Sequence, residues 1–456
     1  MLPRDFLSRL AAIVGEANLL TDPVDCFAYG YDNSRKLAPP EAVALPTQAE
    51  QVGAILRLCN EQDVAVTPRG RGTGTAGGSL PLARGLVLSL ERLRRIQAID
   101  PANRVIVVEP GCLNQEVQDA AKAHGFFWPP DPSSAPFCTV GGNLATGAGG
   151  PHAVKYGTTR NHVLGLRAFT GDGRPIRTGC YTNKGVVGYD LTRLLIGSEG
   201  TLAVITEATL SLTPLPQGSS GLTAHYRDIE TCALAISAIM AQPRTPAALE
   251  FLDRASLDLI RAHRPGLIPE GTAAMLMIEV DGGTAEREQT LEAILRAADN
   301  AGLIEARPVS DPQALWAARK ALSPLLRDIA PKKINEDVVV PVSELPRLLV
   351  GVEALCRRHA IANANFGHAG NGNIHVNLLV NPDDSAQVTR AYACLDEIFS
   401  LVLALKGTLS GEHGIGSEKR AFVAREIDAP TLALMRTIKA AFDPKGLLNP
   451  GKLFPD

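Results

Sequence analysis

The sequence lacks closely spaced cysteines and an excess of charge of either sign. None of its eight cysteines forms a Cys-x-x-Cys pair, which argues against an iron–sulfur cluster or a zinc ribbon. We therefore expect reduced and mostly buried thiols. Forty-five Lys and Arg residues face 48 Asp and Glu residues, for a net charge of −3. Such a balance excludes the basic footprint of a nucleic-acid-binding protein.

Long apolar runs are also missing. The longest one near the C-terminus, Ile398–Leu405, is far shorter than the roughly 18–20 residues that a membrane span requires. Near the N-terminus, Arg4, Asp5 and Arg9 interrupt any apolar stretch, which favours an amphipathic helix over a signal peptide. We expect a soluble, cytoplasmic protein.

The chain changes character near a Pro-, Gly- and Ser-rich segment, Thr213–Gly221, which we interpret as a linker. At 456 residues, more than one domain is expected. Before the linker, a capping box at Thr47–Glu50 predicts a helix that buries Val52, Ile55, Leu56 and Cys59. Strands are expected at 64–67, 86–90, 105–108 and 204–212, with a helix at 114–123.

After the linker, glycine becomes sparse and long helical patterns appear at 229–241 and 285–301. Strand-like segments at 276–280 and 337–340 lie between helices. The pattern predicts the α+β class, with an antiparallel sheet flanked by helices in the second half.

A glycine-rich loop, Pro68–Ser79, is the densest motif of the first half. Its glycines allow successive backbone amides to point inward, and such a concavity binds phosphate oxygens. No Gly-Lys-Ser/Thr follows, so the loop is not a Walker loop, and it does not open into a helix as a Rossmann loop does. Taken alone, it is either a phosphate-binding loop or an ordinary glycine-rich turn.

Histidine and glutamate gather in two glycine-rich segments of the second half, Gly367–Asn377 and Ser410–Gly416. A loop at His368 runs into a strand at Ile374, and the period of two places His375 and Asn377 on one face. Two imidazoles and a carboxylate suit Zn²⁺, with Mn²⁺ or Fe²⁺ as alternatives. Spacing alone equally allows a hydrogen-bonded polar cluster without metal.

The motifs PRGxGT, PPDP, TxGGN, YG and GSEGTLxVIT follow one another in this order, before GHxGxGNxHxN and SGEHGIG. Together they resemble the vanillyl-alcohol oxidase/p-cresol methylhydroxylase (PCMH) superfamily. The chain from about Ala42 onward is similar to its branch of D-lactate dehydrogenases and glycolate oxidase large subunits. The resemblance implies a two-part FAD-binding domain of PCMH type over 1–215. A substrate (cap) domain with an antiparallel sheet would cover 216–425, and 426–456 would return to the FAD domain.

The resemblance also implies which positions meet FAD. Those expected at the pyrophosphate are Arg69, Gly70, Arg71, Gly72, Thr73, Gly74, Thr75 and Ser79. Those expected around the ribityl chain and isoalloxazine are Asp131, Thr139, Gly142, Asn143, Gly149 and Tyr156. Glu199, Gly200 and Ile205 would line the adenine–ribose end, and Asn449 would return from the tail. Further positions assigned to the FAD site are Pro68, Pro110, Pro132, Gly147, Gly150, Gly157 and Val204.

Some members of the superfamily tether FAD through a histidine in or near the glycine loop. No histidine precedes His124 in this chain. His152 lies near the Gly147–Gly157 segment, but the branch that the chain resembles does not tether FAD there. We therefore expect FAD to be bound non-covalently.

For the second half, the resemblance implies that His368, His375 and Glu412 bind a divalent metal and that His413 is the catalytic base. Substrate contacts would come from Asn377, from Arg319 with Ser323 one helical turn later, and from Lys333. The family's lysine aligns either at Lys333 or at Asn335, where this chain would lack it. The alternative for Arg319 is a solvent-exposed helix charge.

These assignments predict FAD-dependent oxidation of a D-2-hydroxy acid to the 2-oxo acid, with D-lactate as the leading substrate. The alternatives are a glycolate or D-2-hydroxyglutarate dehydrogenase, a flavin alcohol oxidase that uses oxygen, and one subunit of a multi-subunit oxidase. Without an iron–sulfur motif, the expected electron acceptor is an electron-transfer flavoprotein, a cytochrome or a quinone. A homodimer is one option, and neither a nucleic acid nor a membrane span is expected.

Overall fold

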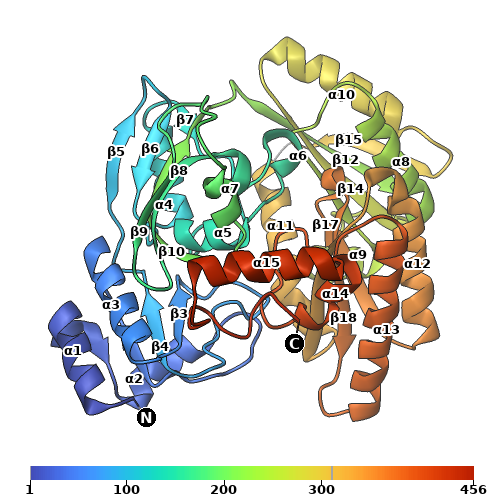
Figure 1. The fold of residues 1–456 in the computed structure, drawn as a ribbon. Coiled ribbons are helices and arrows are strands. Elements are labelled where there is room, and N and C mark those ends of the chain that lie inside the picture. Colours follow the sequence, from blue (N-terminus) through green and yellow to red (C-terminus); the bar gives the residue numbers. More distant parts are fainter. Residues whose placement is uncertain (1, 310–311, 456) are drawn as a thin grey trace. The chain divides into compact units, whose positions relative to one another are not determined.

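The computed structural model describes residues 2–309 and 312–455, without the side chains of residues 312–315. The chain forms two compact units, whose elements are labelled in Figure 1. Unit 1 comprises Met1–Gly149, Gly157–Leu215 and Glu412–Asp456, and unit 2 comprises Gly150–Tyr156 and Pro216–Gly411. Contacts alone define these units, so the domain borders expected above stay a prediction.

The first sheet of unit 1 has four strands in the order β1-β2-β4-β3. These strands are β1 (Leu19–Leu20), β2 (Ala42–Ala44), β4 (Leu86–Ser89) and β3 (Val66–Arg69), and the last three are parallel. Helices α1 (Arg4–Val14) and α3 (Ala49–Glu61) share one apolar core with this sheet. They contribute Phe6, Leu10, Val14, Val52, Ile55, Leu56 and Cys59. The glycine loop thus leaves the end of a strand that is held in a buried sheet.

The helix start at α3 differs from the predicted capping box by one residue. Gln48, not Thr47, is the N-cap. The side-chain oxygen Oε1 of Gln51 accepts hydrogen bonds from the backbone amides of Thr47 (2.8 Å) and Gln48 (3.2 Å). The physical reason is that the Gln51 side chain can also donate, and its Nε2 bonds to Ile13 O at 2.8 Å. The carboxylate of Glu50, an acceptor only, could not tie α3 to the end of α1 in this way.

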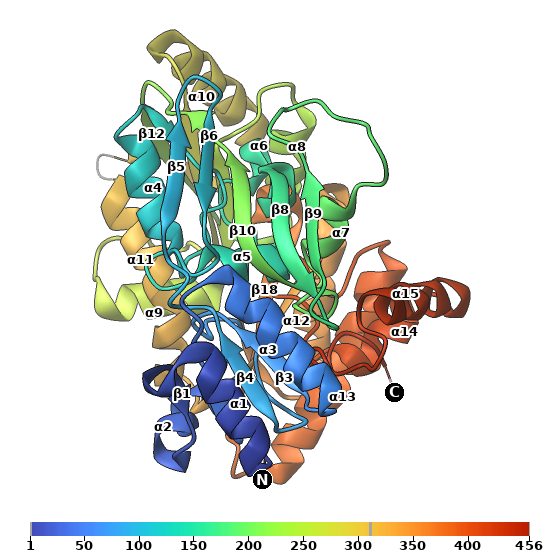
Figure 2. The ribbon, with the colours of Figure 1, turned by 60° about the vertical axis from the view of Figure 1, so that its left-hand side comes forward.

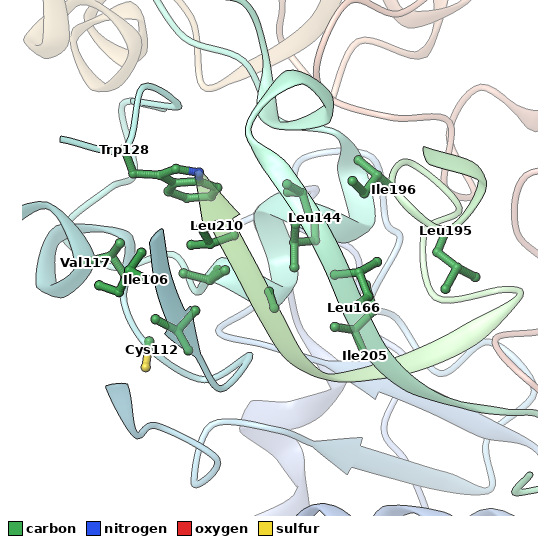
Figure 3. Close-up of a cluster of buried hydrophobic side chains, with 14 of the residues drawn as sticks. Ile106, Cys112, Val117, Trp128, Leu144, Leu166, Leu195, Ile196, Ile205 and Leu210 are labelled. Carbon is green, nitrogen blue, oxygen red and sulfur yellow. The ribbon is translucent and has the colours of Figure 1, made fainter. Parts of the chain in front are cut away.

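The second sheet of unit 1 is antiparallel, with five strands in the order β5-β6-β10-β8-β9 (Figure 2). They are β5 (Ile96–Asp100), β6 (Val105–Val108), β10 (Ala203–Ser211), β8 (Val163–Thr170) and β9 (Pro175–Gly179). Its core includes residues of α4 (Asn114–Lys122), α5 (Val140–Thr146) and α7 (Leu191–Leu195), and Trp128 is fully buried in it (Figure 3).

Further helices and a two-stranded pair belong to unit 1. They are α2 (Pro23–Phe27), the paired strands β7 (Phe126–Phe127) and β11 (Thr213–Pro214), α14 (Val423–Glu426) and α15 (Ala429–Phe442). Ile438 and Phe442 of α15 pack against the core of the five-stranded sheet. The C-terminal segment is therefore part of the same compact unit as the glycine loop.

Unit 2 is built on a seven-stranded antiparallel sheet in the order β15-β12-β14-β13-β17-β18-β16. The strands are β12 (Ser219–Tyr226), β13 (Ala248–Leu252), β14 (Ala274–Asp281), β15 (Leu303–Val309), β16 (Lys332–Val339), β17 (Ala362–Gly367) and β18 (Asn373–Val380). The α+β class and the antiparallel sheet of the second half are thereby confirmed.

Six longer helices and one short helix accompany this sheet among the described residues of unit 2. Helices α8 (Ile229–Ala241), α10 (Thr284–Ala298), α12 (Leu345–Arg358) and α13 (Ser385–Ala404) contact its strands, and α12 lies beside α8 and α13 (Figure 1). Helices α9 (Arg254–His263) and α11 (Pro312–Leu325) share a core with Leu252, Met275 and Phe366. The short α6 (Ala153–Tyr156) contacts β13. In the described part of the chain, no helix has the length and apolar character of a membrane span.

The packing of α1 gives a direct test of the unit 1 core. Leu10 is fully buried, whereas Ser8 on the same helix is exposed. We expect Leu10→Ala to lower the free energy of unfolding by about 2–5 kcal/mol, since it removes buried methyl groups and leaves a cavity. Urea unfolding followed by tryptophan fluorescence measures this loss. Ser8→Ala is the control, expected within about 0.5 kcal/mol of wild type, and equal losses in both variants would contradict the packing of α1.

Candidate active site

The glycine loop of unit 1 offers a row of backbone donors. Among the described residues, none of the amides from Gly70 to Ser79 donates to another backbone carbonyl. Gly72 and Gly77 have positive φ angles (+65° and +73°), and a side chain at Gly74 would meet open space. Consecutive amides of this kind, in a glycine-rich turn, suit the oxygens of a pyrophosphate.

Two side chains predicted at the pyrophosphate are used inside unit 1 instead. The Arg69 guanidinium is buried, donates to Tyr31 O at 2.7 Å and to Ser79 Oγ at 3.2 Å, and lies against Gly72. Ser79 Oγ in turn donates to the buried Asp32 at 3.3 Å. Burial lowers the pKa of Arg69. These side chains thus support the shape of the loop, and its contact with the pyrophosphate of FAD stays a prediction.

Arg71 differs from Arg69 because its side chain is partly exposed. It forms an ion pair with Glu91, with 3.2 Å between Nη1 and Oε2. Surface pairs of this kind contribute little and can exchange partners. Contact between Arg71 and a phosphate stays a prediction.

Three segments singled out in the sequence lie against the glycine loop within unit 1. Thr139 caps α5, and its Oγ1 would be 2.4 Å from a Cβ added at Gly70. A Cβ at Gly200 would meet Pro68 at 3.3 Å. Asn449 Nδ2 donates to Gly78 O (2.9 Å) and to Glu199 O (2.7 Å). The structure therefore brings together the TxGGN, GSEG and tail residues that the resemblance assigned to FAD.

Several of these predicted FAD residues have their side chains engaged within the protein. Asn143 is buried and bonds to Asn114 (3.2 Å) and Cys138 (3.4 Å). Val204 and Ile205 belong to the two apolar cores of unit 1. Asp131 and Pro132 are half-buried, Gly147 ends α5 with a left-handed conformation, and Gly141 packs against Pro110. Gly142, Gly149 and Gly157 also lie in unit 1.

Glu199 lies in unit 1 at a positive φ of 53° and is buried. Its two carboxylate oxygens accept the amides of Ile415 and Gly416, each at 2.7 Å. Burial raises the pKa of Glu199, while these two amides oppose the shift. The carboxylate therefore holds protein backbone, and contact between Glu199 and the adenine–ribose end stays a prediction.

Gly150 and Tyr156 belong to the short segment that packs with unit 2. The Tyr156 hydroxyl donates to Asp281 at 2.5 Å, and Lys155 pairs with the same carboxylate. Burial and the bond to Asp281 raise the pKa of Tyr156. The Tyr156 hydroxyl is thus engaged with the unit 2 sheet.

The predicted metal ligands gather at the end of β17 and the start of β18. His368 follows β17, His375 lies in β18, and both are buried. Their ring centroids are 5.2 Å apart at an interplanar angle of 87°. Backbone space is tight here, because a Cβ at Gly367 would be 2.4 Å from Asn373 O, so glycine is required before His368.

Glu412 follows a residue that is anchored in unit 2. Gly411 N bonds to Asp337 O at 3.1 Å and to Asp337 Oδ2 at 2.8 Å, and Ser410 Oγ bonds to Asp337 Oδ1 at 3.1 Å. One ligand atom each from His368, His375 and Glu412 lies within 4.8 Å of the other two. Two imidazole nitrogens and a carboxylate oxygen form a donor set that fits Zn²⁺, Mn²⁺ or Fe²⁺.

A buried carboxylate that the sequence did not single out joins this cluster to Arg319. Glu250 of β13 is completely buried, and its Oε1 lies 2.5 Å from His368 Nδ1. Its Oε2 accepts from Arg319 Nε at 2.8 Å. Burial raises the pKa of Glu250, but the charges of His368 and Arg319 outweigh it and hold the pKa below its usual value. The Nδ1 contact orients the His368 ring, as second-sphere carboxylates do for metal-bound histidines.

Arg319 is buried, which excludes the alternative of a solvent-exposed helix charge. Its guanidinium lies 4.4 Å from the Phe366 ring centroid. Within the described part of the chain, its hydrogen bond to Glu250 uses Nε. The terminal nitrogens Nη1 and Nη2 are the donors that a bidentate pair with a substrate carboxylate would use.

The other predicted substrate residues are arranged differently. Lys333 Nζ donates to Ser323 Oγ at 2.6 Å, so these two lie together at a more exposed position. Asn377 is fully buried; its Nδ2 donates to Ala364 O (2.8 Å) and its Oδ1 accepts from Asn335 Nδ2 (2.5 Å). Asn377 therefore ties three strands together, and its contact with substrate stays a prediction. Asn335, opposite Asn377 on β16, is not a lysine.

His413, the predicted base, is half-buried in unit 1. Gly414 after it has a φ of +82°, a conformation that favours glycine. The residues that sequence reasoning missed are Glu250 and Asp337. A signal for both exists, because an acid inside an apolar strand such as Ala247–Leu252 must be paired when buried.

Two family models match the chain: a FAD binding domain over residues 40–179 and the FAD linked oxidases, C-terminal domain over residues 215–453. Glycolate oxidase subunit GlcD of Bacillus subtilis is 37% identical over 461 residues, covering 100% of this chain and 97% of the relative. D-2-hydroxyglutarate dehydrogenase of Xanthomonas citri pv. viticola is 36% identical and covers 98% of this chain and 96% of its own. D-lactate dehydrogenase of Archaeoglobus fulgidus is 36% identical, and the match covers 93% of this chain and 95% of the relative.

Solved structures agree on the fold. 4-Ethylphenol oxidase from Gulosibacter chungangensis has a TM-score of 0.80 at 17% identity, covering 99% of this chain and 97% of its own. p-Cresol methylhydroxylase has a TM-score of 0.75 at 16% identity, with 99% and 96% covered. The two family matches and the relatives define the chain as an FAD-dependent oxidoreductase. The chain belongs to the FAD linked oxidases that carry these two domains, and the resemblance predicted from its motifs is confirmed.

The bridge from Glu250 to His368 can be tested by metal content. We expect Glu250→Gln to lower the affinity for Zn²⁺ about 10–100-fold, because the His368 ring loses the carboxylate that orients it. Metal titration of chelator-treated protein measures the affinity. His368→Ala, which removes a proposed ligand outright, is expected to lower the metal stoichiometry. Unchanged binding in both variants would refute a metal site at His368.

Proposed function

We propose that the chain oxidises a small D-2-hydroxy acid to the 2-oxo acid, using non-covalent FAD and a divalent metal, with Zn²⁺ first and Mn²⁺ or Fe²⁺ next. The observation that carries the proposal is the Glu250 bridge, which places the Arg319 fork beside the donor set of His368 and His375. A 2-hydroxy acid presents a carboxylate and a hydroxyl on adjacent carbons, and a fork beside a metal site matches that pair.

D-lactate is the leading substrate, with glycolate and D-2-hydroxyglutarate next. The printed names of the relatives support this range, because they are a glycolate oxidase subunit, a D-lactate dehydrogenase and a D-2-hydroxyglutarate dehydrogenase. Lys333, held at Ser323, is the candidate for a second carboxylate.

In the proposed mechanism, Arg319 binds the substrate carboxylate through its terminal nitrogens. His368, His375 and Glu412 hold the metal, Asn377 contacts the substrate, and His413 takes the hydroxyl proton. When bound, FAD accepts the α-hydride at N5 and the metal lowers the pKa of the hydroxyl. The glycine loop holds the pyrophosphate through its amides, and no histidine before His124 is present to tether the flavin.

The electron acceptor in this proposal is an electron-transfer flavoprotein, a cytochrome or a quinone. One relative is named as a subunit, which supports a second candidate: the chain is the flavin subunit of a larger oxidase. A flavin alcohol oxidase using oxygen is the remaining alternative. A homodimer and a cytoplasmic location stay proposals from the sequence.

The decisive experiment is an anaerobic screen of 2-hydroxy acids, in both enantiomers where they exist, against the purified protein. We expect D-lactate to bleach the flavin absorbance near 450 nm and L-lactate to leave it unchanged. Bleaching in the absence of any partner protein would reject strict dependence on a second subunit. If no 2-hydroxy acid reduces the flavin while another alcohol does, the proposed substrate class is wrong.

The role of His413 is tested with the same assay. His413→Ala is expected to abolish bleaching by the best substrate, because the hydroxyl proton loses its acceptor, while the oxidised flavin spectrum stays intact. His124→Ala, an exposed histidine of the same unit, is the matched control and should reduce at the wild-type rate. Loss of bound FAD in His413→Ala would mean that the residue is structural.

A further inference from the structure

The segment that carries His413 is bound by a buried carboxylate of unit 1. Glu199 accepts the amides of Ile415 and Gly416, each at 2.7 Å, with one amide on each oxygen. These two residues follow His413 after Gly414. Both oxygens of the Glu199 carboxylate therefore accept hydrogen bonds from the backbone just after the proposed base.

The local sequence is shaped around this contact. A Cβ at Gly414 would lie 2.9 Å from Glu199 Oε1, and one at Gly416 would lie 2.0 Å from Ala76 O. Ser417 N also bonds to Ala76 O at 2.9 Å, in the glycine loop. Side chains at 414 or 416 would thus push the segment off both the carboxylate and the loop.

Glu199 is itself held in place. Its φ of 53° is uncommon for a residue with a Cβ, its own amide donates to Ala145 O at 2.8 Å, and Asn449 bonds to its carbonyl at 2.7 Å. The buried Lys419 and Lys452 lie near enough to lower its pKa, against the effect of burial. A carboxylate fixed at its backbone and paired at both oxygens is a rigid support for whatever it binds.

We propose that Glu199 is a positioning residue, which fixes the segment Glu412–Gly416 and thereby orients the His413 imidazole toward the substrate hydroxyl. The inference rests on the proposed function, in which His413 takes the proton. It assigns the carboxylate of Glu199 to catalytic geometry, in place of contact with the adenine–ribose end of FAD. A base displaced by about 1 Å can lose on the order of a hundredfold in rate.

The test compares Glu199→Gln with wild type in the full-length holoprotein. Gln keeps the size of the side chain but turns an amide donor toward one of the two backbone N–H groups. We expect the limiting rate of anaerobic flavin reduction to fall on the order of tenfold to a hundredfold. The FAD-to-protein ratio and the substrate Kd should stay within about twofold of wild type, and hydrogen exchange at Ile415 and Gly416 should become faster.

Asp443→Asn is the matched control. Asp443 is a buried carboxylate of the same unit that also accepts two backbone amides, from Leu447 (3.2 Å) and Leu448 (2.8 Å), outside the segment 412–416. We expect it to lower the melting temperature about as much as Glu199→Gln does while leaving the reduction rate near that of wild type. Should Glu199→Gln fail to fold, Glu199→Asp keeps the charge with a shorter reach and is expected to show the same loss of rate at unchanged Kd.

Wild-type reduction in the Glu199 variants, or an equal loss of rate in Asp443→Asn, would overturn the inference. If Glu199→Gln loses FAD but each bound flavin is reduced at the normal rate, Glu199 is an FAD-binding residue and the inference is wrong. If no 2-hydroxy acid reduces the wild-type flavin, the proposed function is wrong. Hydrogen exchange at the amides of Ile415 and Gly416 then still tests whether Glu199 holds this segment.

Discussion

The fully buried carboxylate of Glu250 is the interaction on which the polar cluster of unit 2 depends. Glu250 lies in a strand that is otherwise apolar, and an unpaired charge there would be strongly destabilising. Its pairing with His368 and Arg319 satisfies both oxygens. One carboxylate therefore orients both the His368 imidazole and the Arg319 guanidinium.

The glycine loop of unit 1, the proposed FAD site, differs from the Glu250 cluster because its side chains bond within the protein. Arg69 and Ser79 turn inward to Asp32 and Tyr31, so the charged groups of the loop stabilise its shape. Among the described residues, the amides from Gly70 to Ser79 donate no hydrogen bond to another backbone carbonyl. Glycine is required where an arginine packs against the loop, as at Gly72.

Sequence reasoning succeeded where the signal is local. The helix predicted at 229–241 coincides with α8, whose start is fixed by the Asp228 side chain accepting from Thr231 N at 2.7 Å. The strand predicted at 204–212 lies one residue from β10 at each end. The alignment of ordered motifs identified the family, and period-two reasoning placed His375 and Asn377 on one face of β18.

What the sequence did not yield depends on contacts between distant residues. Glu250 is 118 residues from His368 and 69 from Arg319, so no spacing rule connects them. The capping box moved by one residue because Gln51 also reaches Ile13, a tertiary contact. Tyr156 and Glu199 carry family motifs, yet their polar groups are bonded to Asp281 and to the backbone of Ile415 and Gly416. Local sequence patterns cannot show whether a side chain bonds to a ligand or to a distant residue of the protein.

The path of the chain between the two units has a mechanical consequence. The backbone passes from one unit to the other at four peptide bonds: 149–150, 156–157, 215–216 and 411–412. No single cut can release either unit as one continuous fragment. At the last crossing, Gly411 is tied to Asp337 and Ile415 to Glu199, so only Glu412, His413 and Gly414 lie between the two anchors. The proposed metal ligand and the proposed base thus occupy a three-residue stretch whose two flanking residues are each hydrogen-bonded within their own unit.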